Sequence, residues 1–349
     1  FSSKVLCEDS ENWENESVYN HIAIGKWADI FVLAPLTANS INKLANGIAD
    51  NLLTQTALAF LGKKLIAPAA NTNMLKNSIT QENLQKLVNN GFEIVSSQVK
   101  ELACKDIGDG AMAEPIEIYF ETLRASLKNE YWNKRKVVLS GGGTIEKIDE
   151  VRYISNFSSG KMASSLALAL YIKGADVDLV STRGHENLPK NIQTSEVNSS
   201  EEMLLSINKS LENSCNYNKK SYIFMVAAVS DYIPTNISKG KLKKEDLGNT
   251  WDLKLKQNID ILSSINKEDI ISIGFKAEMD EKKAKINANS MLGRKNLDGV
   301  CLNIINDENH FGSASNKIEL ILKDNSYTFD GEKLDISFEI LEKLESEFI

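Results

Sequence analysis

The sequence predicts an α/β protein of two domains, each a mainly parallel sheet covered by helices on both faces. The chain has 349 residues, more than the roughly 250–300 at which a single hydrophobic core stops growing. Short apolar runs of strand length alternate with segments of helical spacing, which is typical of parallel sheets. This alternation restarts after a charged connector at residues 125–134. We therefore expect one domain at residues 1–128 and a second at residues 129–349.

Strands and helices alternate along the first domain. Continuous apolar runs bounded by turn residues predict strands at Asp29–Pro35, Lys63–Asn71 and Phe92–Ser97. Apolar residues at helical spacing predict helices over 39–61, 80–91 and 118–134. The order of these elements favours a parallel sheet between two helical layers.

The second domain repeats this pattern. Apolar runs predict strands at Arg135–Thr144, Ala175–Thr182, Ser221–Tyr232, Asp269–Glu278 and Gly299–Ile305. Helical spacing predicts helices over 165–174 and 278–299. Residues 317–324 and 326–331 are expected to close the sheet as a hairpin-like edge.

Composition excludes several classes of protein. A net charge of −8 and a pI near 5.2 argue against nucleic acid as a partner, because no basic face dominates. No apolar run approaches the roughly 18 residues of a membrane helix, so no membrane partner is expected. The cysteines lie far apart without a CxxC pair, which favours a reducing, cytoplasmic location over a disulfide framework or a zinc site. They are Cys7, Cys104, Cys215 and Cys301.

Two loops rich in small residues could hold phosphate. The segment "ISNFSSGKMAS" (Ile154–Ser164) precedes an apolar helix, where serines can cap the helix or its free N–H groups can bind an anion. The segment "SGGGT" (Ser140–Thr144) follows a strand but lacks both the G-x-G-x-x-G and the GK[ST] spacing, so a tight turn remains an equal alternative. A lysine-rich stretch (Ser238–Lys244) could be a solvated charge run. Together the three segments favour a nucleoside triphosphate site.

Longer motifs carry a specific resemblance over nearly the whole chain. The second half resembles the phosphopantothenate–cysteine ligases in "VRYISNFSSGKM", "AAVSDY", "KLKK", "IGFKAE" and "RKNLDGV". The first half resembles the flavin-dependent phosphopantothenoylcysteine decarboxylases in "NHIAIGKWADI", "APLTANSINKLANGIADNLL", "PAANTNM" and "LACKDIGDGAMAEP". In this order the motifs resemble the bifunctional coenzyme A biosynthesis family that fuses the two activities.

The resemblance implies two Rossmann-like three-layer domains, the first flavodoxin-like and without its opening strand and phosphate loop. It implies CTP-dependent ligation of 4'-phosphopantothenate with cysteine through an acyl-cytidylate, with Mg²⁺. FMN-dependent decarboxylation of phosphopantothenoylcysteine to 4'-phosphopantetheine then follows. It also implies a homo-oligomer, with a dodecamer as the assembly that combines trimeric and dimeric contacts. Two alternatives stay open: a non-catalytic flavoprotein-type regulatory subunit, and a nicotinamide oxidoreductase, against which the missing G-x-G-x-x-G counts.

The resemblance assigns roles in the decarboxylase half. His21 matches the active-site histidine, Asn71 the residue that binds the substrate carboxylate, and Cys104 the proton donor. Met74 matches a further substrate contact, and Ala70 stands where the family usually has methionine. The FMN-binding positions are Thr37, Ala38, Asn39, Ser40 and Ala69.

The resemblance likewise assigns roles in the ligase half. Lys241 matches the lysine that neutralises the α-phosphate, and Asn156 the residue that orients the acyl-cytidylate. A second family lysine is replaced by Met291, for which Arg294, three residues on, is a candidate substitute. The motifs do not identify the ligands of Mg²⁺. The remaining CTP positions are Met225, Val226, Ala227, Asp231, Ile259, Asp260, Ile261, Leu262, Phe275 and Lys295.

Overall fold

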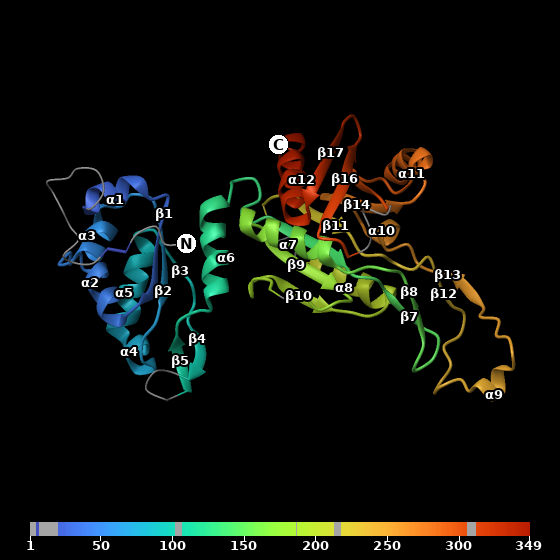
Figure 1. Cartoon of the computed structure of the whole chain (residues 1–349), viewed down its shortest axis with the longest axis horizontal. Helices are drawn as coiled ribbons and strands as arrows, with labels where there is room; N and C mark the ends of the chain where they lie inside the picture. The colour runs from blue at the N-terminus through green and yellow to red at the C-terminus, as the bar shows by residue number, and fades with distance from the viewer. Residues whose placement is uncertain (1–4, 7–19, 102–106, 186, 213–217, 306–311) are drawn as a thin grey trace. The chain divides into compact units, whose positions relative to one another are not determined.

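The computed structural model describes residues 5–6, 20–101, 107–185, 187–212, 218–305 and 312–349. The chain divides into two compact units, Phe1–Lys128 and Asn129–Ile349. Each unit is an α/β assembly with its own sheet (Figure 1), and each is described by itself.

The sheet of the first unit consists of the three parallel strands that the apolar runs predict. They are β1 (Ile30–Leu36), β2 (Lys63–Pro68) and β3 (Phe92–Ile94), in that order. β1 and β2 align Leu33 with Ile66, and β2 and β3 align Ile66 with Ile94. All three strands therefore end at the same edge of the sheet.

Helices cover both faces of this sheet. Leu33 and Ile66 belong to a core shared with α2 and α5, whereas Leu65 and Ala67 pack in a separate core with α6. Successive residues of a strand point to opposite faces, so the apolar runs supply both cores. The helices of this unit are α1 (His21–Trp27), α2 (Ala38–Ala45), α3 (Leu52–Ala59), α4 (Thr72–Lys76), α5 (Ser78–Asn89) and α6 (Pro115–Leu127).

The single helix predicted over 39–61 is wrong, because the structure has two helices there. The chain leaves α2 through Gly47, whose φ of +69° only glycine adopts readily. Asn51 then starts α3 as an N-cap, in a capping box with Thr54. The helix predicted over 118–134 is also shorter than expected, since α6 ends at Leu127.

The second unit is built on an eight-stranded sheet. Its order is β10–β9–β6–β11–β14–β15–β16–β17. Neighbouring strands from β10 to β15 are parallel, and β16 and β17 form the antiparallel closing hairpin that the sequence predicts. The strands are β6 (Lys136–Gly141), β9 (Asp176–Ser181), β10 (Gln193–Glu196), β11 (Ser221–Met225), β14 (Ile270–Glu278), β15 (Gly299–Ile304), β16 (Ser315–Leu322) and β17 (Ser326–Glu332).

Two helical layers flank this sheet. α7 (Lys161–Lys173) and α12 (Lys333–Glu347) pack against each other and against sheet strands. α8 (Ser200–Glu212), α10 (Ile261–Ser264) and α11 (Glu281–Arg294) share a different core with β6, β9, β11 and β15. The architecture is thus the three-layer, Rossmann-like arrangement that the sequence predicts.

Short antiparallel hairpins, which the sequence did not predict, extend from both units (Figure 1). In the second unit β12 contacts β7, and α9 lies in the loop between β12 and β13. Among the described residues, no helix has both the length and the apolar character needed to cross a bilayer. The hairpins are β4 (Gln98–Glu101) with β5 (Ile107–Ala111), β7 (Ile145–Lys147) with β8 (Tyr153–Ser155), and β12 (Tyr232–Pro234) with β13 (Leu255–Gln257); α9 is Lys244–Leu247.

Candidate functional site

The glycine loop after β6 lies at the carboxyl edge of the second sheet, where Gly142 lines a cavity. Gly142 has a φ of +78°, and a Cβ on it would lie 2.2 Å from Thr182 Oγ1. A Cβ on Gly143 would lie 2.4 Å from the carbonyl oxygen of Asn156. The Ala228 N–H donates to the carbonyl oxygen of Gly142 at 2.8 Å. The glycines therefore let three chain segments pack closely, which is the turn role that the sequence left open.

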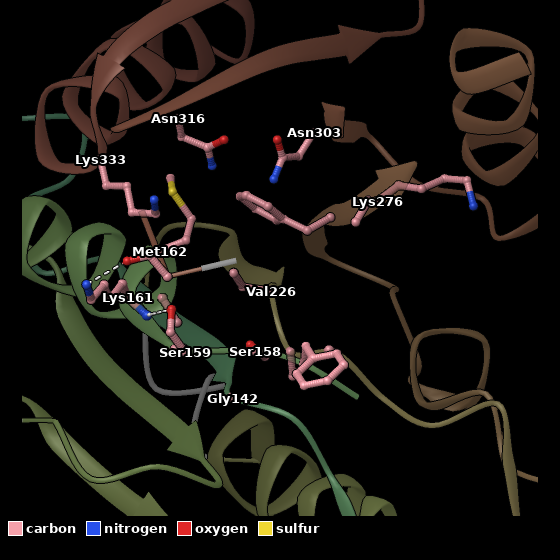
Figure 2. Close-up of a pocket in the computed structure, with 18 residues that line it drawn as sticks. Gly142, Ser158, Ser159, Lys161, Met162, Val226, Lys276, Asn303, Asn316 and Lys333 are labelled. Carbon is pink, nitrogen blue, oxygen red and sulfur yellow. Dashed lines mark hydrogen bonds between the residues drawn. The ribbon is translucent and has the colours of Figure 1, made fainter. Parts of the chain in front are cut away.

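The serine-rich segment before α7 lines the first of two adjoining cavities. Gly160 is the N-cap of α7, with a φ of 74° and no capping side chain. Figure 2 shows Ser158, Ser159, Lys161 and Met162 around this cavity, which we call the serine-loop cavity. The Lys161 N–H reaches the Ser159 hydroxyl at 3.5 Å, and the other N–H groups of this uncapped helix start favour an anion.

Lysines give the serine-loop cavity a positive lining. Lys333 is 8% exposed, and its ammonium donates to the Ser315 carbonyl at 2.8 Å. Burial and the charge of Lys161 hold the pKa of Lys333 below its usual value. Lys161 donates to the Gly312 carbonyl at 2.7 Å. Among the described lining residues there are three lysines and no carboxylate, so the cavity suits an anionic ligand.

A second cavity of about 570 Å³ adjoins the first, and we call it the Asp260 cavity. Most of the residues predicted to bind CTP line it, although they come from different loops of the sequence. Asn156 is tied to this region because its amide donates to the Val229 carbonyl at 3.1 Å. Val226 lines the serine-loop cavity instead. The predicted residues in the Asp260 cavity are Asn156, Met225, Ala227, Asp231, Ile259, Asp260, Ile261, Leu262, Phe275 and Lys295.

An ion pair and an unsatisfied hydroxyl mark this cavity as a polar site. The Lys295 ammonium lies 2.8 Å from Asp260 Oδ2. Burial alone would raise the pKa of Asp260, but hydrogen bonds from Lys295 and Ser263 lower it below the usual value. Ser230 is 3% exposed, and its Oγ has no protein partner among the described residues. Such a buried hydroxyl is normally satisfied by water or a ligand.

The lysine-rich stretch Ser238–Lys244, which we call the lysine loop, is held by hydrogen bonds to neighbouring residues. Lys241 itself is exposed and lines neither cavity. Its neighbour Leu242 donates its N–H to Asp149 at 3.1 Å and accepts from Arg152 at 2.6 Å. Asp149 is 1% exposed. Burial would raise the pKa of Asp149, but hydrogen bonds from Val151, Arg152 and Leu242 hold it far below the usual range. The structure thus fixes the backbone beside Lys241 without bringing its side chain to either cavity.

The cation that lies near Met291 in the cavity is not Arg294, the substitute that the sequence suggested. Met291 is buried and lines the Asp260 cavity, whereas Arg294 is exposed and lines neither cavity. Lys276, in the motif "IGFKAE", lines both. Sequence reasoning missed Lys276, Lys161 and Lys333 as site residues. The first two lie within quoted motifs, but Lys333 carries no sequence signal.

In the first unit, predicted FMN residues gather at the carboxyl edge of the sheet. Thr37 follows β1 and caps α2, where its hydroxyl accepts from the Ser40 N–H. Ala69 follows β2, and its N–H donates to the Leu36 carbonyl at 2.9 Å. Ala38 is buried, and Asn39 is exposed. Thr37 and Ala69 therefore begin neighbouring loops.

The "PAANTNM" segment also lies at the carboxyl edge of the first sheet. Asn71 caps α4, and its side chain accepts from the Asn73 N–H at 2.9 Å. The Ala70 N–H donates to the Gly110 carbonyl at 3.0 Å, and a Cβ on Gly110 would lie 2.1 Å from the Ala70 oxygen. The β4–β5 hairpin therefore docks directly beside Asn71.

The other residues that the resemblance assigns to the first unit lie in different surroundings. His21 is the first residue of α1, and Met74 is 54% exposed on α4. Cys104 lies outside the described residues. Within the described ranges, no group of three His, Cys, Asp or Glu residues could hold a metal ion.

Comparisons with known proteins place both units in recognised families. A two-unit α/β protein with cavities at the sheet edge is a common ligand-binding architecture. The flavoprotein family matches residues 2–126, and the DNA/pantothenate metabolism flavoprotein C-terminal domain family matches residues 132–348. The chain belongs to the family of coenzyme A biosynthesis bifunctional proteins.

Two relatives and one solved structure illustrate the similarity. The coenzyme A biosynthesis bifunctional protein CoaBC of Vibrio cholerae is 36% identical over 322 residues, which cover 90% of this chain and 77% of that protein. A cysteine/cysteine sulfinic acid decarboxylase from an unknown prokaryotic organism is 36% identical over 316 residues, covering 88% and 85%. The crystal structure of the C-terminal domain of CoaBC matches with a TM-score of 0.50 and 26% identity, covering 62% of this chain and 98% of that one.

Proposed function

We propose that the chain makes 4'-phosphopantetheine in two steps, a CTP-dependent ligation in the second unit and an FMN-dependent decarboxylation in the first. The observation that carries the ligation is the pair of adjoining cavities at one sheet edge, with most of the predicted nucleotide residues in one of them. Open α/β sheets bind ligands at this edge.

In the ligation, the carboxylate of 4'-phosphopantothenate attacks the α-phosphorus of CTP and releases pyrophosphate. The cysteine amine then attacks the acyl carbon of the acyl-cytidylate and displaces CMP. CTP occupies the Asp260 cavity, where Asp231, Asp260 and the Ser230 hydroxyl offer polar partners. The phosphate of 4'-phosphopantothenate lies in the serine-loop cavity, which Lys161 and Lys333 make positive.

Mg²⁺ accompanies the triphosphate in this proposal. Mg²⁺ in nucleotide sites is usually held by phosphate oxygens and only one or two carboxylates, so it needs no preformed protein cage. Asp231 and Asp260 are the carboxylates that line the proposed nucleotide cavity. Magnesium-dependent pyrophosphate release tests this step.

The decarboxylase half fits a flavin at the edge where Thr37, Ala69 and Asn71 begin their loops. Thr72 Oγ1, beside Asn71, is buried without a protein partner among the described residues, which suits a polar ligand group. Thr37, Asn39, Ser40 and the Ala69 backbone would hold FMN, which supplies two-electron oxidation and reduction when bound. Asn71 would bind the substrate carboxylate, and Cys104 would return a proton.

The relative that decarboxylates cysteine suggests a second candidate substrate for the first unit. Free cysteine lacks the phosphopantothenoyl chain, so comparing the two compounds as substrates shows which of them the first unit prefers. We expect carbon dioxide from phosphopantothenoylcysteine at a far lower substrate concentration than from cysteine. A preference for cysteine, with no CMP formed from CTP and 4'-phosphopantothenate, would contradict the two-step proposal.

Self-association is part of the proposal. Trp27 on α1 is 79% exposed, Leu58 on α3 is 64% exposed, and Leu61 after α3 is 96% exposed. Apolar side chains of this size are candidates for contact with another copy. Light scattering on the intact chain should report a homo-oligomer, and the family resemblance suggests a dodecamer. A monomer at micromolar concentration would contradict this part.

A further inference from the structure

The two cavities share one wall. Ligation brings the acyl substrate in one cavity to the nucleotide in the other, so the α-phosphorus must lie near that wall. Among the described residues, Lys276 is the charged member of the wall. The residues that line both cavities are Ala227, Ala228, Phe275, Lys276 and Ala277.

The alternation of side chains along β14 places the Lys276 side chain on the side of the Asp260 cavity, the proposed nucleotide site. Gly274, two residues earlier on β14, has the side chains of Met291 and Leu262 where a Cβ would stand. Residues two apart on a strand share a face, so the Lys276 side chain lies on the α10–α11 side of the sheet. Figure 2 shows its ammonium directed away from Lys161 and Lys333. Lys276 also lies two residues beyond Gly274, which pairs with Met225, the last residue of β11, so it stands at the carboxyl edge of the sheet.

The Lys276 ammonium can exchange its present carboxylate partner for a phosphate oxygen. It lies 3.0 Å from Glu278 Oε1, and the two side chains are 28% and 18% exposed. The same Glu278 oxygen accepts from the Asn287 amide at 2.8 Å. Asn287 can therefore keep Glu278 in place when the ammonium moves to a phosphate oxygen. Because this ion pair is partly exposed to solvent, it can be replaced by a more highly charged ligand.

The other candidate cations are less well placed. Lys241 and Arg294 are exposed and outside both cavities. Lys295 lines only the Asp260 cavity and is not part of the shared wall. Met291, one helical turn from Asn287, is neutral. Charge developing at the α-phosphate requires a cation near the shared wall.

We propose that Lys276 is a phosphate-binding residue of the nucleotide site, exchanging its ion pair with Glu278 for the phosphates of CTP. This inference rests on the proposed ligase function. It supplies the cation that Met291 lacks and makes Arg294 unnecessary for this contact.

Calorimetric titration of the intact protein tests the assignment through binding rather than turnover. Lys276→Met removes the charge at nearly constant length, and it should raise the Kd for CTP by about tenfold or more, the effect of one lost charge-assisted hydrogen bond. The Kd for cytidine, which has no phosphate, should stay unchanged. Lys276→Arg should restore CTP binding. Lys282→Met, an exposed lysine of α11 outside both cavities, is the matched control and should bind like wild type.

A second variant tests the exchange. Glu278→Gln keeps an acceptor for Asn287 but removes the competing charge, so the Kd for CTP should fall. Unchanged CTP binding by Lys276→Met, or an equal loss of cytidine binding, would overturn the assignment of Lys276 but not the proposed nucleotide site. A wild-type protein that binds cytidine and CTP equally, or binds no CTP, would overturn the proposed nucleotide site and the Lys276 assignment together.

Discussion

The Lys295 ammonium lies 2.8 Å from Asp260 Oδ2 in the lining of the Asp260 cavity. Asp260 also caps α10 by accepting from the Ser263 N–H. One carboxylate therefore fixes both a helix start and a cation at the proposed nucleotide site. Burial would raise its pKa, so the hydrogen bonds from Lys295 and Ser263 must account for the lowered value.

Lys295→Met should raise the pKa of Asp260, because it leaves burial unopposed by the lysine. A carboxyl-detected NMR titration would measure this shift. The depressed pKa means that the pair stabilises the fold above about pH 4 and loses this effect as the pH falls through the lower, folded-state value. The side chains are 25% and 45% exposed, so the loss should be only about 0.2–1 kcal/mol. An unshifted Asp260 would contradict the pairing in solution.

Asp149→Asn should release the lysine loop. Asp149 accepts from the backbone N–H groups of Val151, Arg152 and Leu242 and from the Arg152 side chain. Asparagine keeps one acceptor oxygen but loses the charge, so the Leu242 segment should open more often. Limited trypsinolysis should then cleave faster at Lys241 and Lys243. Asp252→Asn is a control outside this contact set, and an equal cleavage rate in all three proteins would contradict the anchoring role.

Gly110→Ala should disable the decarboxylase half and spare the ligase half. The new Cβ would lie 2.1 Å from the Ala70 oxygen, so the β4–β5 hairpin must shift from its place beside Asn71. We expect at least a tenfold loss of carbon dioxide release from phosphopantothenoylcysteine, about 1.4 kcal/mol. Pyrophosphate release from CTP should not change.

Gly25→Ala is the matched control in the same unit. Its Cβ would meet Phe60 backbone atoms at 3.8 Å or beyond, which is ordinary contact. Alanine also favours the helix by up to about 1 kcal/mol. If Gly25→Ala damaged decarboxylation as much as Gly110→Ala, the docking argument would fail.

Cys104→Ser tests the proton donor that the family resemblance assigns. A serine hydroxyl is a far weaker acid than a thiol, so carbon dioxide should still be released while little 4'-phosphopantetheine forms. Mass spectrometry of the products measures both. Normal 4'-phosphopantetheine output would refute the assignment, and ligation should be unaffected in either case.

The sequence predicted the main strands and three-layer class because buried parallel strands are continuous apolar runs. Hydrophobic periodicity could not show the break between α2 and α3, because apolar spacing continues across it. The turn depends on the positive φ of Gly47 and the cap at Asn51. The β7–β8 and β12–β13 hairpins have only three residues per strand, too few to establish a period.

Family motifs predicted most of the residues that gather in the Asp260 cavity. They did not predict that Lys276 lines it, because that depends on how distant elements pack. Asn156, Asp260 and Phe275 meet in one cavity as their motifs suggest. Arg294 is close to Met291 in sequence, but it is exposed outside both cavities, whereas Lys276 on a different element lines them. Sheet register decides this, because it sets which strand residue stands beside α11.

Oxygen transfer tests the central claim most directly. If the carboxylate of 4'-phosphopantothenate attacks the α-phosphorus of CTP, a substrate labelled with ¹⁸O in that carboxylate should pass one ¹⁸O to CMP when cysteine displaces it. Mass spectrometry should find one label in CMP, none in pyrophosphate, and 4'-phosphopantetheine as the final product. Unlabelled CMP, or label in inorganic phosphate together with CDP, would contradict an acyl-cytidylate and with it the account of the second unit.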